Sequence, residues 1–304
     1  MNDGYIHTAL RAAERTLALH RNVAHDGLLR YKLKKLIRHP YRYMRVAAYK
    51  LHMLGEVARA RTFFGAHITV PLSDVNAVDL YYAGCLRAAS EGYVTRFLLQ
   101  TIKPGSIFYD IGANYGFYSV LAAFRGAYVH AFDPSSHCAP LLTETFRSQH
   151  GYPPITFNQI ALADGAETVE YFDMSAGHKS GMSTINAAVA LSTTMAYTTS
   201  QVRAMTLDKY VETHEIPDVI KIDTEGSEAL ILAGAQRLLS SHSPTIVMEV
   251  WGKGQSGAEN SARAITLLTE AGYRAHSIMG DGSITPTGIH LEMIGENNNF
   301  VFKK

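Results

Sequence analysis

The sequence has few cysteines and no long apolar run. Only Cys85 and Cys138 occur among the 304 residues. Their contexts are unrelated, so we expect neither a disulfide framework nor a cysteine-ligated metal cluster, and a reducing setting is the default. No run approaches the roughly 18 apolar residues of a membrane span, and the N-terminus has no basic stretch followed by an apolar core. The sequence therefore predicts a cytoplasmic protein, either soluble or peripheral to the inner face of the membrane.

The chain as a whole also lacks an excess of charge. It contains 28 Lys and Arg against 27 Asp and Glu. This balance argues against a nucleic-acid partner, because such proteins carry a marked excess of positive charge. The apolar content of 47% is enough to bury one full α/β core.

Acidic residues are missing from one segment, between Gly27 and Gly55. Eight Lys and Arg residues fall there, interleaved with tyrosine, leucine and other apolar residues. This pattern is typical of an amphipathic basic helix. We expect residues 1–65 to form a basic helical extension. Residues 28–54 either contact an anionic membrane surface or charged glycan, or carry cations that are merely solvated, and a homo-oligomer contact through their apolar residues stays open.

Residues 66–304 change character and alternate between strands and helices. Short apolar, β-rich runs occupy residues 107–110, 128–133, 155–160, 219–223 and 245–250, and helix-like segments lie between them. Such alternation specifies an α/β fold, because parallel strands need crossover helices. We predict a Rossmann-like domain with a mostly parallel seven-stranded sheet and helices on both faces. Its ligand edge is at the carboxyl ends of the strands.

Two stretches interrupt this alternation. Residues 173–200 are rich in small and polar residues and predict a long loop that covers the site. Residues 288–304 alternate around three asparagines and predict a terminal β-hairpin.

The most informative motif follows the first predicted strand of the alternating region. It reads Asp110-Ile-Gly112-Ala113-Asn114-Tyr115-Gly116. Its glycines allow close approach of a ligand. The spacing is not the dinucleotide G-x-G-x-x-G, and the lysine of a phosphate-binding loop is missing. Asp110 would repel a pyrophosphate but suits the cationic methionine end of S-adenosylmethionine.

Further carboxylates end the next strands. Asp133 can accept hydrogen bonds from both hydroxyls of a ribose. Asp164 follows Ala161 after the third strand, where it either receives an adenine amino group or forms an ordinary Asp-Gly turn. A buried strand then delivers Asp223 and Glu225 to the same edge.

Taken together, these segments resemble the FkbM family of S-adenosylmethionine-dependent methyltransferases. The resemblance spans roughly residues 91–250 and implies the class I methyltransferase fold. The family commonly has Glu where this chain has Asp133, and the shorter carboxylate still reaches a ribose. The resemblance implies cofactor contacts by Asp110, Gly112, Ala113, Asn114, Tyr115, Gly116, Asp133, Ala161, Asp164 and Asp223.

The family resemblance also implies O-methylation, which needs a base to remove the hydroxyl proton. The candidate bases are Asp223, Glu225, His178 and Glu249. The pair Asp223 and Glu225 could also hold a divalent metal ion. His178 could equally be a solvated loop residue, and Glu249 could pair with a lysine.

The alternatives differ in cofactor and in substrate. A nicotinamide-dependent oxidoreductase shares the sheet, but the missing G-x-G-x-x-G argues against it. A non-catalytic module that binds the cofactor and docks on a glycan-assembly complex is a second alternative. We favour a saccharide hydroxyl as acceptor, with a small natural product as the alternative, because one fold serves many acceptors.

Overall fold

The computed structural model describes Thr8 and residues 36–37, 40–86, 89–294 and 298–304. Most of the predicted basic extension therefore lies outside the described residues. The chain forms two compact units, Met1–Gly92 and Tyr93–Lys304. Among the helices within these ranges, none has the length and apolar character needed to cross a membrane.

The first unit combines helices with a two-stranded hairpin. Helix α3 (Pro40–Lys50) begins at a proline, which is tolerated in the first turn of a helix. Strands β1 (Val57–Arg61) and β2 (His67–Pro71) pair antiparallel, followed by α4 (Val75–Ala83). The predicted boundary between residues 65 and 66 falls in the turn that joins β1 to β2.

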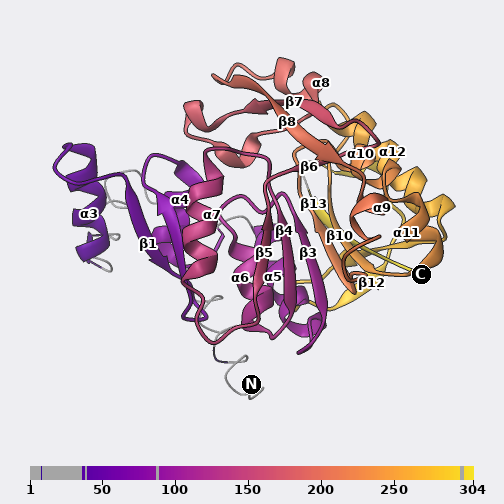
Figure 1. Cartoon of the computed structure of the whole chain (residues 1–304), viewed down its shortest axis with the longest axis horizontal. Coiled ribbons are helices and arrows are strands. Elements are labelled where there is room, and N and C mark those ends of the chain that lie inside the picture. The colour runs from indigo at the N-terminus through magenta and orange to yellow at the C-terminus, as the bar shows by residue number, and fades with distance from the viewer. Residues whose placement is uncertain (1–7, 9–35, 38–39, 87–88, 295–297) are drawn as a thin grey trace. The chain divides into compact units, whose positions relative to one another are not determined.

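The second unit contains the predicted α/β sheet (Figure 1). Five strands run parallel in the order β10 (Thr245–Val250), β9 (Val219–Ile222), β3 (Ile107–Ile111), β4 (Tyr128–Phe132) and β5 (Ile155–Asn158). All five overlap predicted strands. The α/β, Rossmann-like prediction is confirmed.

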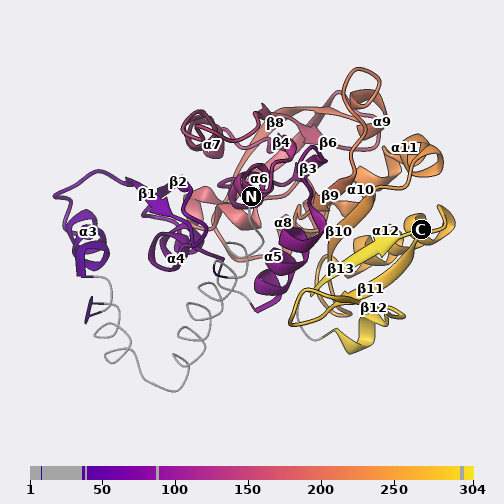
Figure 2. The ribbon, with the colours of Figure 1, turned by 90° about the horizontal axis from the view of Figure 1, so that it is seen from below.

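Three antiparallel strands extend the sheet beyond β10. Their order is β13 (Asn298–Lys303), β11 (Arg274–Ile278) and β12 (Ile284–Pro286), as Figure 2 shows. The sheet thus has eight strands where seven were predicted, because the short β12 adds an edge. The prediction of a terminal hairpin was wrong. The last strand inserts between β10 and β11, where its buried run Phe300–Phe302 is covered on both sides.

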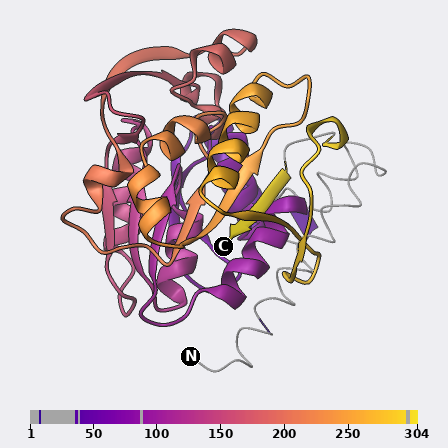
Figure 3. The same cartoon turned by 90° about the vertical axis from the view of Figure 1, so that its right-hand side faces the viewer.

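Helices cover the sheet on both faces. Helices α6 (Phe117–Phe124) and α7 (Cys138–Arg147) connect β3, β4 and β5, and α5 (Ala89–Thr101) precedes β3. Right-handed crossovers place α9 (Leu207–Tyr210), α10 (Glu228–Ala233), α11 (Gln236–Ser241) and α12 (Ala258–Glu270) on the opposite face. Figure 3 shows the orange and gold helices of this second group in front of the strands.

A smaller sheet interrupts the alternation after β5. Its order is β6 (Ala161–Leu162), β8 (Thr198–Met205) and β7 (Thr168–Asp173), and β7 pairs antiparallel with β8. The segment predicted as a long loop is partly ordered. It contains the short helices η2 (Ser175–Gly177), η3 (Ser180–Met182) and α8 (Ala187–Ser192). Outside this segment, a further 3-10 helix, η4 (Leu291–Met293), precedes β13.

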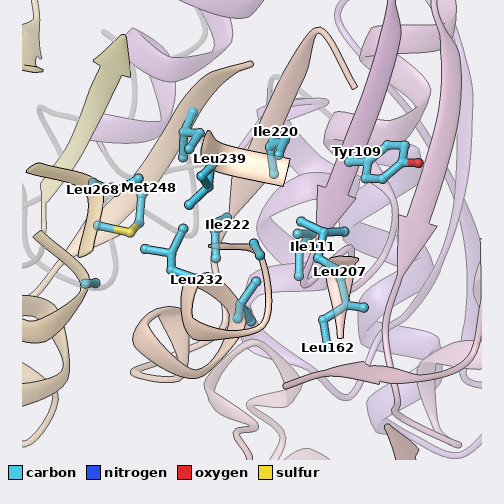
Figure 4. Packing of buried hydrophobic residues seen from close by; sticks show 14 of the residues in the cluster. Tyr109, Ile111, Leu162, Leu207, Ile220, Ile222, Leu232, Leu239, Met248 and Leu268 are labelled. Atoms are coloured by element: carbon cyan, nitrogen blue, oxygen red, sulfur yellow. The ribbon is translucent and has the colours of Figure 1, made fainter. Parts of the chain in front are cut away.

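The hydrophobic core lies between the central strands and the helices of the second group (Figure 4). Ile111, Ile222 and Met248 of β3, β9 and β10 pack in one cluster with Leu232 of α10 and Leu268 of α12. Burying such a side chain stabilises the fold by about 1.5–3 kcal/mol. The core thereby holds the carboxyl ends of β3, β9 and β10 in a defined arrangement.

Candidate active site

Asp110 lies near the end of β3 and is almost completely buried, with 1% of its surface exposed. The Ser119 hydroxyl donates a hydrogen bond of 2.5 Å to Oδ2. Oδ1 has no hydrogen-bond partner among the described residues. Burial raises the pKa of Asp110, and the nearby Lys221 ammonium opposes this shift. The carboxyl group therefore has one acceptor atom left for a ligand.

The turn after β3 requires glycine. Gly112, Asn114 and Gly116 have positive φ values of 86°, 50° and 81°. The amides of Gly112 and Ala113 both donate to the Phe132 carbonyl at 3.0 Å, which fixes the turn to the end of β4. A Cβ atom on Gly112 would lie 1.9 Å from the carbonyl oxygen of Asp223. The predicted close-approach turn thus passes directly over the end of β9.

Asp133 follows β4 and joins two loops. Its Oδ2 accepts the amide of Asn114 at 2.7 Å, and its Oδ1 accepts the amide of Ser135 at 2.9 Å. Burial raises the pKa of this carboxyl group to about 7, although both amide bonds oppose the shift. Asp133 therefore braces the glycine turn from the neighbouring strand end.

The third predicted cofactor element is only partly enclosed. Ala161 begins β6 and is buried, whereas Asp164 is exposed in the turn after this strand. Tyr115, within the glycine turn, is buried. A contact between Asp164 and an adenine ring stays a prediction.

Lys221 is a site residue that the sequence analysis missed. It lies in β9 with 2% of its side chain exposed, and its Nζ is 2.6 Å from Asp223 Oδ2. The ammonium also lies 4.6 Å from the centre of the Tyr118 ring. Asp110 is its register partner on β3. A charged residue inside the otherwise apolar run Val219–Ile222 was the signal that could have found it, because buried lysines need a partner.

Three carboxylates meet at the ends of β9 and β10. One oxygen from each of Asp223, Glu225 and Glu249 lies within 4.8 Å of the others, and all three residues are half-buried. The Trp251 indole donates to Glu249 Oε2 at 3.0 Å. The structure thus brings together three of the four candidate bases, from two separate strands. Carboxylate oxygens at this spacing could also ligate a hard cation.

Glu225 occupies an unusual backbone position, with φ of 53°. Burial raises its pKa well above the usual value, and the charges of Glu249 and Asp223 raise it further. Strained backbone of this kind concentrates at functional sites. Glu228 stabilises the turn that contains Glu225, since its Oε1 accepts hydrogen bonds from the amides of Thr224 and Gly226 at 3.2 Å.

The segment between β7 and β8 docks on both loops of the site. The Ser180 hydroxyl lies within hydrogen-bond distance of the Tyr115 hydroxyl, at 2.6 Å, and of Asn114 Oδ1, at 3.1 Å. Asn186 donates to the Gly226 carbonyl at 2.5 Å. His178, the fourth candidate base, is exposed at the end of η2 and is not part of the carboxylate group.

A cavity of about 840 Å³ opens beside the ends of β4 and β5. Pro134, Ile160 and β8 contribute to its wall, together with Lys209 and His214 after them in the chain. Pro134 directly follows Asp133 in the sequence, and Ile160 directly precedes Ala161. The cavity therefore borders the strand ends at which the sequence predicts the nucleoside to bind.

The comparison with protein-family models identifies a methyltransferase domain. The sequence profile of the Methyltransferase FkbM domain matches residues 110–275. A methyltransferase FkbM from Methylobacillus flagellatus is similar at 15% identity and a TM-score of 0.41, over 76% of this chain and 55% of that one. No curated protein matches the chain.

Two further solved structures show weak similarity. A precorrin-6y C5,15-methyltransferase from Geobacter metallireducens is 10% identical, with a TM-score of 0.39 over 70% of this chain and 87% of that one. The magnesium protoporphyrin IX methyltransferase of Synechocystis, solved with bound S-adenosylmethionine, is 14% identical, with a TM-score of 0.39 over 69% and 76%.

Proposed function

The chain belongs to the FkbM methyltransferase family, and from this premise we propose that it transfers a methyl group from S-adenosylmethionine to a hydroxyl oxygen. The observation that carries the proposal is Glu225. It is a carboxyl group with a raised pKa, held beside Asp223 and Glu249. Asp223 in turn contacts the glycine turn that is predicted to bind the cofactor.

The residues around the turn fit the cofactor. Asp110 offers a buried, unpartnered carboxylate oxygen to a cationic group. Gly112 leaves no room for a side chain between the turn and Asp223. Asp133 stands at the adjacent strand end, where a carboxylate can accept hydrogen bonds from ribose hydroxyls. We propose that Asp110 binds the methionine end of S-adenosylmethionine and Asp133 binds its ribose, while Gly112 lets the turn pass close to Asp223.

The protein supplies the base for the reaction. S-adenosylmethionine, when bound, supplies a methyl group attached to a positively charged sulfur. Glu225 accepts the proton of the attacking hydroxyl, because its raised pKa makes it a stronger base than an ordinary carboxylate. The Lys221 ammonium contacts Oδ2 of Asp223 at 2.6 Å. We therefore assign Asp223 to balancing the charge of Lys221 and to orienting the acceptor, and not to proton transfer.

A saccharide hydroxyl is the acceptor class that we propose. Three neighbouring carboxylates provide several hydrogen-bond acceptors at once, which suits a polyol with adjacent hydroxyl groups. A small natural product with a hydroxyl group is the alternative. The divalent metal ion on Asp223 and Glu225 stays a prediction.

Calorimetric titration of the purified protein tests the cofactor assignment. We expect micromolar binding of S-adenosylmethionine and S-adenosylhomocysteine, and no binding of NADH. Asp110→Ala should remove most of the affinity for S-adenosylmethionine, because the buried acceptor is lost. Binding of NADH alone would overturn the proposal, and so would unchanged affinity in a folded Asp110→Ala variant.

Cofactor binding is expected to weaken at acidic pH through Asp133. Its pKa of about 7 means that the carboxyl group is protonated below neutrality and then loses acceptor capacity. Affinity for S-adenosylhomocysteine should fall about tenfold between pH ~8 and pH ~6. Because the folded-state pKa is raised, the ionised group also costs stability, and this cost is complete above pH ~7.

The control for this pH dependence is Asp133→Asn, which does not titrate. The ligand's own titration affects both proteins equally. The affinity of the wild-type protein for S-adenosylhomocysteine divided by that of the variant therefore isolates the contribution of Asp133. We expect this ratio to grow from about pH 6 to about pH 8. A ratio that is constant with pH would show that Asp133 stays in one protonation state.

A further inference from the structure

Exposed apolar side chains are concentrated in one short part of the first unit. Thirteen large hydrophobic residues are exposed among the described residues, and eight of them lie between residues 36 and 57. The remaining five, which are spread over the rest of the described chain, are Val75, Tyr128, Leu191, Met279 and Met293. We call residues 36–57 the apolar segment. It contains the exposed residues Leu36, Ile37, Tyr41, Met44, Leu51, Met53, Leu54 and Val57.

Helix α3 carries part of this segment and is attached to neighbouring residues of the first unit. Val46 is buried on one face of the helix, while Tyr41 and Met44 are 78% and 64% exposed. Arg42 donates to the Tyr82 carbonyl at 2.7 Å, which attaches the helix to α4. Arg45 donates to the carbonyl groups of Gly55 and Val57 at 2.6 and 3.0 Å. These contacts within the first unit therefore fix the orientation of α3, with Tyr41 and Met44 exposed to solvent.

The charge around the apolar segment has one sign. No acidic residue occurs between Gly27 and Gly55, and eight Lys and Arg residues do. Lys50 ends α3 and is exposed, and Arg59 and Arg61 follow on the exposed face of β1. Along the sequence, the exposed apolar residues thus alternate with cations, and Glu56 is the one acidic residue between residues 27 and 73.

We propose that the apolar segment is a docking surface for an anionic lipid bilayer. The lipid head groups complement the cations, and the acyl boundary accepts the apolar side chains. A hydrophilic polyanion would satisfy only the charges and would leave the apolar side chains in water. A second copy of this segment would bring like charges together. The inference is independent of the proposed function.

Vesicle sedimentation with the full chain tests this surface. We expect binding to vesicles of phosphatidylcholine mixed with phosphatidylglycerol, weaker binding to phosphatidylcholine alone, and weakening by salt. Tyr41→Ser combined with Met44→Ser should reduce the partition coefficient at least about tenfold, because both side chains lose their apolar contact with lipid. Lys50→Glu should reduce binding only to the anionic vesicles.

The matched control combines Leu191→Ser with Met293→Ser. These residues are 70% and 81% exposed and lie outside the apolar segment, so vesicle binding should not change. Circular dichroism checks that both double variants are folded. Equal loss of binding in the two double variants would overturn the proposal. Stronger binding to dextran sulfate than to anionic vesicles would assign a polyanion instead, and a dimer lost only in Tyr41→Ser with Met44→Ser would assign a second copy.

Discussion

Gly112→Ala is expected to lower the free energy of unfolding by about 2–5 kcal/mol and to abolish binding of S-adenosylmethionine. Two costs combine. The left-handed backbone at Gly112 disfavours any side chain, and the new Cβ would stand 1.9 Å from the Asp223 carbonyl oxygen. Because that oxygen belongs to the main chain, the glycine turn and the end of β9 must move apart. Urea denaturation and calorimetry measure the two effects.

Gly105→Ala is the matched control for the steric cost. Gly105 has the same φ of 86°, but no atom lies within 4 Å of the position its Cβ would take. We expect this variant to lose only about 1–2 kcal/mol, the cost of the left-handed conformation. It should bind the cofactor normally. Equal destabilisation by both substitutions would contradict the close contact between the turn and Asp223.

Glu225→Gln is expected to slow methyl transfer by a factor of about 10²–10⁴ and to leave the affinity for S-adenosylmethionine nearly unchanged. The amide has almost the same shape as the carboxylate but cannot accept the hydroxyl proton. The measurement follows a radiolabelled methyl group onto an acceptor found by screening sugars and glycosides. Glu270→Gln, at the exposed end of α12, is the control and should keep the full rate.

The pH profile separates Glu225 from its neighbour Glu249. The charge of Glu249 contributes to the raised pKa of Glu225. Glu249→Gln should therefore lower that pKa and move the acidic limb of the rate profile to lower pH, with the rate retained above it. If Glu249→Gln instead removed the activity while Glu225→Gln kept it, Glu249 would be the base.

The glycine turn was predictable because its chemistry is local. Asp110, Gly112 and Gly116 lie within seven consecutive residues, and the conformation of such a turn depends on which of them lack a Cβ atom. The parallel strands were predictable for a similar reason, since each is a short apolar run between helices. These elements also carry the family resemblance, which the profile match confirms.

The position of the last strand was not predictable from its own residues. The alternation before and within β13 suggested a hairpin, whereas the strand pairs with β10 and β11. Pairing partners distant in sequence are selected by the burial of whole faces. The antiparallel pair β7 and β8 was missed for the same reason, because a 24-residue separation, from Asp173 to Thr198, hides the pairing.

The sequence by itself determined which residues end the strands and which turn is predicted to bind a cofactor, because strand length, glycine positions and helix starts depend on neighbouring residues. Only the tertiary structure decided that Glu249 joins Asp223 and Glu225, and that Lys221 balances Asp223 from within the sheet. The physical reason is that parallel pairing of β9 with β10 sets the register between residues more than 20 positions apart. Charged groups that share one buried site then shift one another's pKa values, and no local sequence pattern predicts such a shift.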